Sequence, residues 1–122
     1  MSKELILIID DEKAICDILS QMLDKSGFTT ICFYNFTTAK PYYEKKHAYV
    51  DVVLMDLNLP DVNGEEAIVE LKGINPDVKI IILSGYINGE SQYGSNFGAK
   101  RLIQKPVNII DLEKAVSDVL EE

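Results

Sequence analysis

The sequence of 122 residues has no tryptophan, one histidine and two cysteines. Cys16 and Cys32 are too few for a disulfide framework and do not form a CxxC pair, so we expect both to be reduced. No apolar run approaches the ~18 residues of a membrane span, and the N-terminal run Leu5–Ile9 is too short for a secretory signal. These absences predict a cytoplasmic protein with no membrane segment.

Basic residues are also few, because 12 Lys and Arg stand against 20 Asp and Glu, and the net charge is −8. No basic patch is present, so we expect no direct nucleic-acid binding by this chain. At this length one domain is the default, and we expect residues 1–122 to form a single domain. That domain is either independent or a fragment of a longer protein.

Short apolar runs recur along the chain and indicate five β-strands. Three runs are continuous, which is typical of strands covered on both faces in a parallel sheet. They are Leu5–Ile9, Val52–Met55 and Ile80–Leu83. The runs Thr29–Phe33 and Arg101–Gln104 are mixed in polarity, which suits edge strands.

Segments with apolar residues at helical spacing lie between these runs. They are Glu12–Ser26, Gly64–Lys72 and Asn108–Glu121. Gly27 is suited to the position after the first helix, and Asn108 is a good N-cap for the last.

Two other connections have weaker helical signals. Pro41 lies inside Thr37–Lys46, so we expect that helix to be short or to begin near Lys40. The segment Tyr86–Gly98 is rich in glycine and serine, which opposes a helix. We expect residues 86–96 to be the most mobile part of the fold and the part that responds to a modification of the site described below.

Strand and helix alternate about every 24 residues, a pattern that predicts a parallel sheet with helices on both faces. The expected fold is therefore an α/β, doubly wound, five-stranded parallel sheet. In such sheets, sites form outside the carboxyl ends of the strands.

Polar residues stand at the end of nearly every predicted strand. Asp10 and Asp11 follow the first, Asp56 the third, Ser84 the fourth and Lys105 the fifth. Clustered carboxylates repel one another, and a hard divalent cation such as Mg²⁺ relieves that repulsion with oxygen ligands. A carboxylate can attack phosphorus, and a cation and a lysine can neutralise the phosphoryl oxygens.

In these features the sequence resembles the receiver domains of bacterial two-component response regulators, over essentially the whole chain. The resemblance implies a flavodoxin-like sheet with strand order 2-1-3-4-5. The residues that carry it are Asp10-Asp11 after LILII, Asp56 in VVLMDLNLPDVNG with Pro60 and Gly64, Ser84-Gly85 after IIIL, and Lys105-Pro106 after RLIQ.

The resemblance implies that Asp56 accepts a phosphoryl group from the phosphohistidine of a sensor histidine kinase. It implies that Mg²⁺ is held by Asp10, Asp11, Asp56 and the backbone carbonyl of Asn58, with Asp11 favoured over Asp10 as a direct ligand. Ser84 and Lys105 would each contact a phosphoryl oxygen, and Gly85 would leave room for the donor. A cis Lys105–Pro106 peptide is common in the family.

Such a domain is a signalling module that catalyses only its own phosphorylation and dephosphorylation, as a monomer or a phosphorylation-dependent dimer. Its downstream effector is not readable from the sequence. One departure is Leu102, where the family usually has an aromatic residue that moves inward on phosphorylation. His47, the only histidine, is interpreted as a solvated surface residue rather than a phosphodonor.

Two other functions remain open at this point. The first is a Mg²⁺-dependent phosphohydrolase with an Asp nucleophile, although such enzymes usually carry the nucleophile in a DxD stretch after the first strand and need a cap. The second is a binding module of the same fold that is not phosphorylated, although such modules usually lose an acid or the lysine, and this chain retains them.

Overall fold

The computed structural model of the chain describes residues 3–85 and 97–122. The expectations for mobility and response at residues 86–96 lie outside these ranges. The described strands form one parallel sheet in the order β2-β1-β3-β4-β5, as the family resemblance implied. The strands are β1 (Leu5–Ile9), β2 (Thr29–Phe33), β3 (Val52–Asp56), β4 (Ile80–Ser84) and β5 (Arg101–Gln104).

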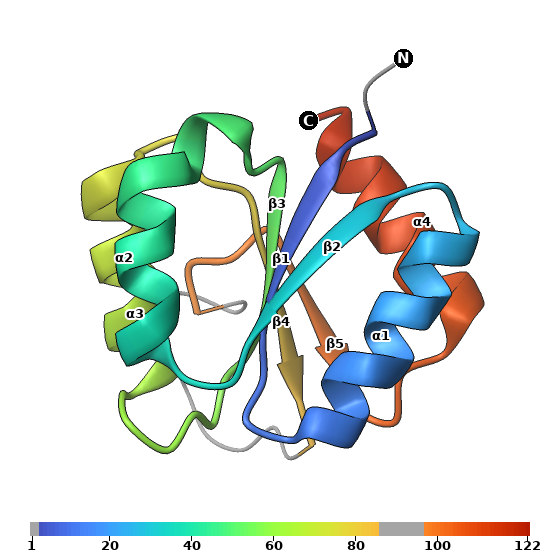
Figure 1. Cartoon of the computed structure of the whole chain (residues 1–122), viewed down its shortest axis with the longest axis horizontal. Coiled ribbons are helices and arrows are strands. Elements are labelled where there is room, and N and C mark those ends of the chain that lie inside the picture. Colours follow the sequence, from blue (N-terminus) through green and yellow to red (C-terminus); the bar gives the residue numbers. More distant parts are fainter. Residues whose placement is uncertain (1–2, 86–96) are drawn as a thin grey trace.

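Helices cover both faces of this sheet. Figure 1 views the sheet nearly edge-on, with α2 (Phe36–Lys46) and α3 (Gly64–Ile74) on one side and α1 (Lys13–Lys25) and α4 (Ile109–Leu120) on the other. A short 3₁₀ turn, His47–Tyr49, joins α2 to β3. Within the described ranges, no helix combines the length and the hydropathy needed to cross a bilayer.

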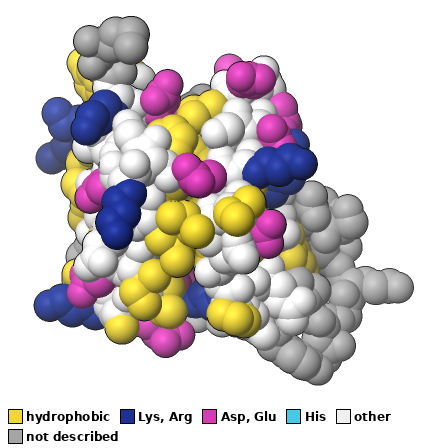
Figure 2. All heavy atoms as spheres, turned by 90° about the vertical axis from the view of Figure 1, so that its right-hand side faces the viewer, with side chains coloured by type: hydrophobic (Ala, Val, Ile, Leu, Met, Phe, Trp, Pro, Cys, Tyr) yellow, Lys and Arg dark blue, Asp and Glu magenta, His cyan; other side chains and the backbone are white. Residues whose placement is uncertain are grey.

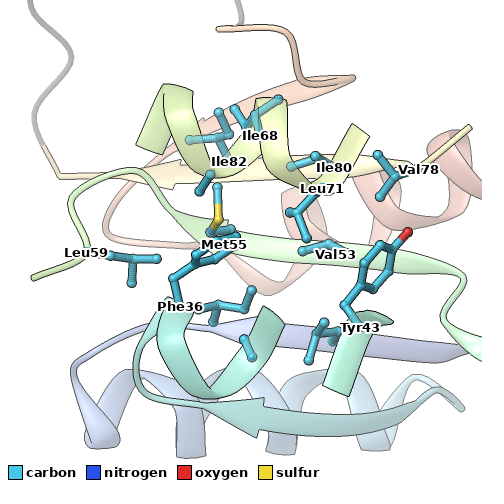
Figure 3. Close-up of a cluster of buried hydrophobic side chains, with 14 of the residues drawn as sticks. Phe36, Tyr43, Val53, Met55, Leu59, Ile68, Leu71, Val78, Ile80 and Ile82 are labelled. Atoms are coloured by element: carbon cyan, nitrogen blue, oxygen red, sulfur yellow. The ribbon is translucent and has the colours of Figure 1, made fainter. Parts of the chain in front are cut away.

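The two faces of the sheet bury two separate apolar clusters. In β1, Leu7 and Ile9 contact the cluster under α2 and α3, whereas Ile6 and Ile8 contact the cluster under α1 and α4. This alternation explains why the inner strands are continuous apolar runs, since each side chain is buried on one face or the other. Figure 3 shows the first cluster, in which the Phe36 and Tyr43 side chains of α2 point toward the sheet.

The helix ends use the residues that the sequence indicated. Gly27 follows α1 with φ of +93°, a backbone conformation that favours glycine. The Asn108 side chain accepts a hydrogen bond from the backbone N–H of Ile110 at 2.8 Å and so caps α4. The cap of α3 was not predicted: it is Asn63, whose side chain accepts from the Glu65 N–H at 2.9 Å.

The predicted late start of α2 is wrong, because the helix begins at Phe36 and contains Pro41 in its interior. Asn35 caps its first turn by accepting a hydrogen bond from the Thr38 N–H at 2.9 Å. Pro41 cannot donate to the carbonyl of Thr37, but both residues are exposed, so water can bond that carbonyl. Because water can reach this carbonyl, the proline destabilises the helix less than it would at a buried position.

Candidate functional site

The carboxyl edge of the sheet collects the polar residues that end the strands. In Figure 1 this is the lower edge, toward which the arrowheads of β4 and β5 point. Asp10 follows β1 directly, Asp56 and Ser84 are the last residues of β3 and β4, and Lys105 follows β5. The parallel order places β1, β3, β4 and β5 side by side, so these four side chains share one edge.

Three carboxylates form a compact cluster at this edge. Asp10, Asp11 and Asp56 each offer one oxygen, and these atoms lie within 4.8 Å of one another. Asp10 is fully buried and Asp56 is 5% exposed, whereas Asp11 is exposed. Oxygen ligands at this spacing, partly buried and partly open to water, fit a hard divalent cation that keeps several waters, such as Mg²⁺.

Lys105 neutralises part of this negative charge. Its Nζ atom lies 2.9 Å from Asp10 Oδ2 and 3.2 Å from Asp56 Oδ2. Burial by itself would lower the pKa of Lys105, but the hydrogen bond and charge of Asp10, followed by those of Asp56, raise that pKa above its ordinary value. The lysine therefore stays charged and connects the ends of β1, β3 and β5.

Backbone N–H groups fix the other oxygen of each buried carboxylate. Asp10 Oδ1 accepts from the Glu12 N–H and Asp56 Oδ1 accepts from the Asn58 N–H, each at 2.9 Å. In each carboxylate, one oxygen thus accepts from a backbone N–H of its own loop, and the other accepts from Lys105 Nζ. This arrangement orients Asp56 without occupying all of its lone pairs.

The loop that follows Asp56 is held from two sides. A Cβ atom at Gly64 would lie 2.4 Å from the carbonyl oxygen of Leu57, so a larger residue at position 64 would displace this loop. At the other side, Asp61 accepts hydrogen bonds from the N–H groups of Phe36, at 3.1 Å, and Thr37, at 2.7 Å. Asp61 was not predicted from the sequence, although an acid next to Pro60 in a loop was a signal for a capping residue.

The ends of β4 and β5 complete the site. Ser84 is fully buried, and its carbonyl accepts a hydrogen bond from the Lys105 N–H at 2.8 Å. The Lys105–Pro106 peptide is cis. Leu102, the departure from the usual aromatic residue noted in the sequence, packs against the cluster under α2 and α3, which also contains Phe97.

The other candidate, His47, lies away from this edge. His47 is in the turn before β3, whereas Asp56 ends that strand, so roughly 17 Å of strand separates them. Cys16 and Cys32 are free thiols, as expected. Burial of Cys16 is complete, and Cys32 is partly exposed.

The arrangement combines a carboxylate cluster that could hold a cation, an oriented carboxylate and a fixed ammonium group. A carboxylate in this setting can act as a nucleophile toward phosphorus, because cation and lysine together offset the charge of the phosphoryl oxygens. The site therefore suits the transfer of a phosphoryl group to Asp56.

Comparisons with known proteins point in the same direction. A family model described as the response regulator receiver domain matches residues 6–117. Sporulation initiation phosphotransferase F of Bacillus subtilis is 31% identical, over 98% of this chain and 96% of its own. Regulatory protein VanRc of Enterococcus gallinarum is 27% identical over 96% of this chain, which spans 50% of that relative's length.

Solved structures agree with the fold. The receiver domain protein from Methanospirillum hungatei, described as CheY-like, is 31% identical with a TM-score of 0.90, and the match covers 98% of this chain and 95% of that one. The DrrB receiver domain, solved in a form activated by BeF3, is 26% identical with a TM-score of 0.81, and the match covers 99% of this chain and 100% of that one.

Proposed function

The chain belongs to the response regulator receiver domain family, and from this premise we propose that Asp56 is its phosphoacceptor. The donor is the phosphohistidine of a sensor histidine kinase. One observation carries the proposal: Asp56 ends the central strand, is almost fully buried, and has one oxygen on a backbone N–H and the other 3.2 Å from Lys105 Nζ. The Asp56 carboxylate is therefore an oriented nucleophile with the Lys105 ammonium group beside it.

The transfer forms one bond and breaks one. A carboxylate oxygen of Asp56 attacks the phosphorus atom, the bond between phosphorus and the donor imidazole nitrogen breaks, and the electron pair stays on that nitrogen. In the proposed role, Lys105 then pairs with a phosphoryl oxygen, and the Ser84 hydroxyl donates a hydrogen bond to another. The Asn58 N–H continues to donate its hydrogen bond to Asp56 Oδ1.

The site fits Mg²⁺ because its donor set consists of oxygen atoms from three clustered carboxylates. We propose that Asp10, Asp11 and Asp56 hold the ion together with the backbone carbonyl of Asn58. When bound, Mg²⁺ supplies positive charge against the phosphoryl oxygens. Exposed Asp11 is the ligand most open to solvent, and therefore the one through which the ion enters.

A protein donor has an apolar surface to contact beside the site. Figure 2 shows hydrophobic side chains gathered on the face formed by α1 and α4. Ile18 of α1 is 48% exposed and Ile110 of α4 is 70% exposed. Each helix begins soon after a site residue, α1 after Asp11 and α4 after Lys105. Exposed apolar patches of this kind commonly mark protein contacts.

We further propose that phosphorylation changes the partner-binding face and that the domain has no other enzymatic activity. The proposed setting is the cytoplasm, with a downstream effector domain or protein and with no direct contact to nucleic acid. Residues 1–122 would act as one domain, as a monomer or a phosphorylation-dependent dimer. The family match gives no support to a phosphohydrolase or to an unphosphorylated binding module.

The experiment is incubation of the protein with acetyl phosphate and Mg²⁺, followed over time by intact mass and by release of inorganic phosphate. The proposal predicts an adduct that approaches one phosphoryl group per chain and persists. Rapid phosphate release over many turnovers without a lasting adduct would instead indicate a phosphohydrolase. The absence of both adduct and release would indicate a binding module that is not phosphorylated.

A further inference from the structure

A pair of thiols lies beneath the site, where α1 packs on the edge strand β2. Cys16, in the first turns of α1, is fully buried, and Cys32, in β2, is partly exposed. The Cys32 Sγ atom lies 3.7 Å from the carbonyl oxygen of Cys16 and 3.0 Å from Ser20 Oγ. Both cysteines pack in the apolar cluster under α1 and α4. The two cysteines are therefore neighbours, and Cys32 is the less buried of the two.

The two thiols differ in reactivity. The neighbouring Cys16 thiol and, second, the Ser20 hydroxyl lower the pKa of Cys32. Cys16 is fully buried, so a solute in water reaches Cys32 first. Since the thiolate is the nucleophile, Cys32 is the sulfur that reacts first, and Cys16 is placed to react second.

The pair also holds the backbone of Asp10. The Cys16 thiol donates a hydrogen bond to the Asp10 carbonyl at 3.3 Å, and the Asp10 N–H donates to the carbonyl of Phe33, the neighbour of Cys32, at 3.1 Å. A change that joins the two sulfurs removes the first of these donors. It also restrains the residue next to Phe33. Either effect acts on the backbone that carries the Asp10 carboxylate.

We propose that Cys16 and Cys32 are a peroxide-responsive pair that forms a reversible disulfide between α1 and β2, and that this disulfide alters the position of Asp10. The disulfide itself does not depend on the function proposed above, whereas its effect on Mg²⁺ binding rests on that function.

The reaction balances with hydrogen peroxide as the oxidant. The Cys32 thiolate attacks one peroxide oxygen, the O–O bond breaks, and hydroxide leaves, so that Cys32 is oxidised to a sulfenic acid. The Cys16 sulfur then attacks the Cys32 sulfur, the S–O bond breaks, and hydroxide leaves with the Cys16 proton as water. In sum, two thiols and one peroxide give one disulfide and two waters, and a dithiol reductant reverses the change.

The first test treats the reduced protein with a small excess of hydrogen peroxide and examines it by mass spectrometry after denaturing alkylation. We expect loss of two hydrogen atoms, a cross-linked peptide pair containing Cys16 and Cys32 within one chain, and recovery with dithiothreitol. Cys16→Ser should stop at a sulfenic acid on Cys32 that dimedone traps. Cys32→Ser, which changes the less buried sulfur, should leave Cys16 unmodified.

Ser20→Ala is the matched variant for the hydrogen bond to Cys32. It keeps both thiols and should slow the loss of Cys32 thiol without preventing the disulfide. Both thiols surviving the treatment, or disulfides found only between chains, would overturn the proposal. The assigned order of reaction would fail if Cys16 were modified before Cys32 in the parent.

The second test compares the Kd for Mg²⁺ of reduced and oxidised protein by isothermal titration calorimetry. We expect binding several-fold weaker after oxidation in the parent and no change in peroxide-treated Cys32→Ser. Equal affinities of reduced and oxidised parent would overturn the effect on Asp10. If the reduced parent binds no Mg²⁺, the proposed metal site fails and the coupling with it, while the disulfide is still decided by the mass measurement.

Discussion

At the scale of single residues, Lys105 is the side chain that makes the acidic cluster compatible with a folded sheet edge. It contacts both buried carboxylates, and its own side chain is only 15% exposed. Like charges this close would otherwise favour protonation of one acid or separation of the strand ends. The same lysine is proposed to contact the phosphoryl group. It would therefore stabilise the sheet edge before the transfer and the phosphorylated Asp56 after it.

The first prediction concerns the pH dependence of this contact. Lys105→Met should lower the free energy of unfolding by about 2 kcal/mol at neutral pH, because it leaves two carboxylates without their partner. The pKa of Lys105 is raised above its ordinary 10.5, so its contribution is complete below that pH and is lost as the pH rises through the higher folded value.

Urea unfolding of parent and variant at a series of pH values measures the difference. We expect a constant gap up to about pH 10 and a shrinking gap above pH 10.5. The tyrosines and other lysines titrate in both proteins, so they cancel in the comparison. A gap that grows with alkaline pH, or a variant as stable as the parent at neutral pH, would refute the role assigned to Lys105.

At the scale of elements, α2 is linked to the site through the loop after Asp56. Asp61 in that loop accepts hydrogen bonds from the first turn of α2, and these bonds outweigh the effect of burial and lower the pKa of Asp61. The helix thus has two acceptors at its start, Asn35 and Asp61. Together they stabilise the first turn, in which the Thr37 carbonyl receives no hydrogen bond from Pro41.

We predict that Pro41→Ala stabilises the protein by about 1–3 kcal/mol, because the new N–H can donate to the Thr37 carbonyl and the steric conflict with that carbonyl is removed. The greater freedom of the unfolded variant offsets part of the gain. Thermal unfolding measures the change. Lys45→Ala, an exposed position in the same helix, is the control and should have little effect. Equal or lower stability of Pro41→Ala would show that the proline suits this helix.

This helix also shows where prediction from sequence stops. The five strands and the other three described helices were predicted within one or two residues at most ends, because their apolar spacing and caps are local signals. The start of α2 was not, because the local cap Asn35 was overlooked and the second acceptor, Asp61, is distant in sequence. The site residues could be placed at one edge by the rule for parallel sheets, but the hydrogen bonds of Lys105 with Asp10 and Asp56 required the structure.

At the scale of the whole molecule, the parallel sheet brings strand ends that are far apart in the sequence together at one site. The net charge of −8 adds to the local repulsion of the cluster, so a divalent cation bound at the proposed site would relieve an electrostatic cost. Stability should therefore depend on Mg²⁺ as a property of the entire fold. This consequence can be measured without a phosphodonor.

We predict that Mg²⁺ raises the melting temperature of the parent and raises that of Asp11→Ala less. Binding at about 100 times the Kd stabilises a folded protein by about 2.7 kcal/mol, which corresponds to a shift of several degrees. Asp77→Asn removes an exposed acid from the connection before β4, at the other edge of the sheet, and should respond to Mg²⁺ as the parent does. Equal shifts for all three proteins would contradict the metal assignment.

The most direct test of the account is the position of the phosphoryl group. Incubation with acetyl phosphate and Mg²⁺, followed by peptide mapping with mass spectrometry, identifies the modified residue. The account predicts modification of Asp56 alone, none in Asp56→Asn, and loss of the modification when Mg²⁺ is chelated before the donor is added. Modification of Asp10, Asp11 or His47, or of Asp56 to the same extent with the metal removed, would contradict it.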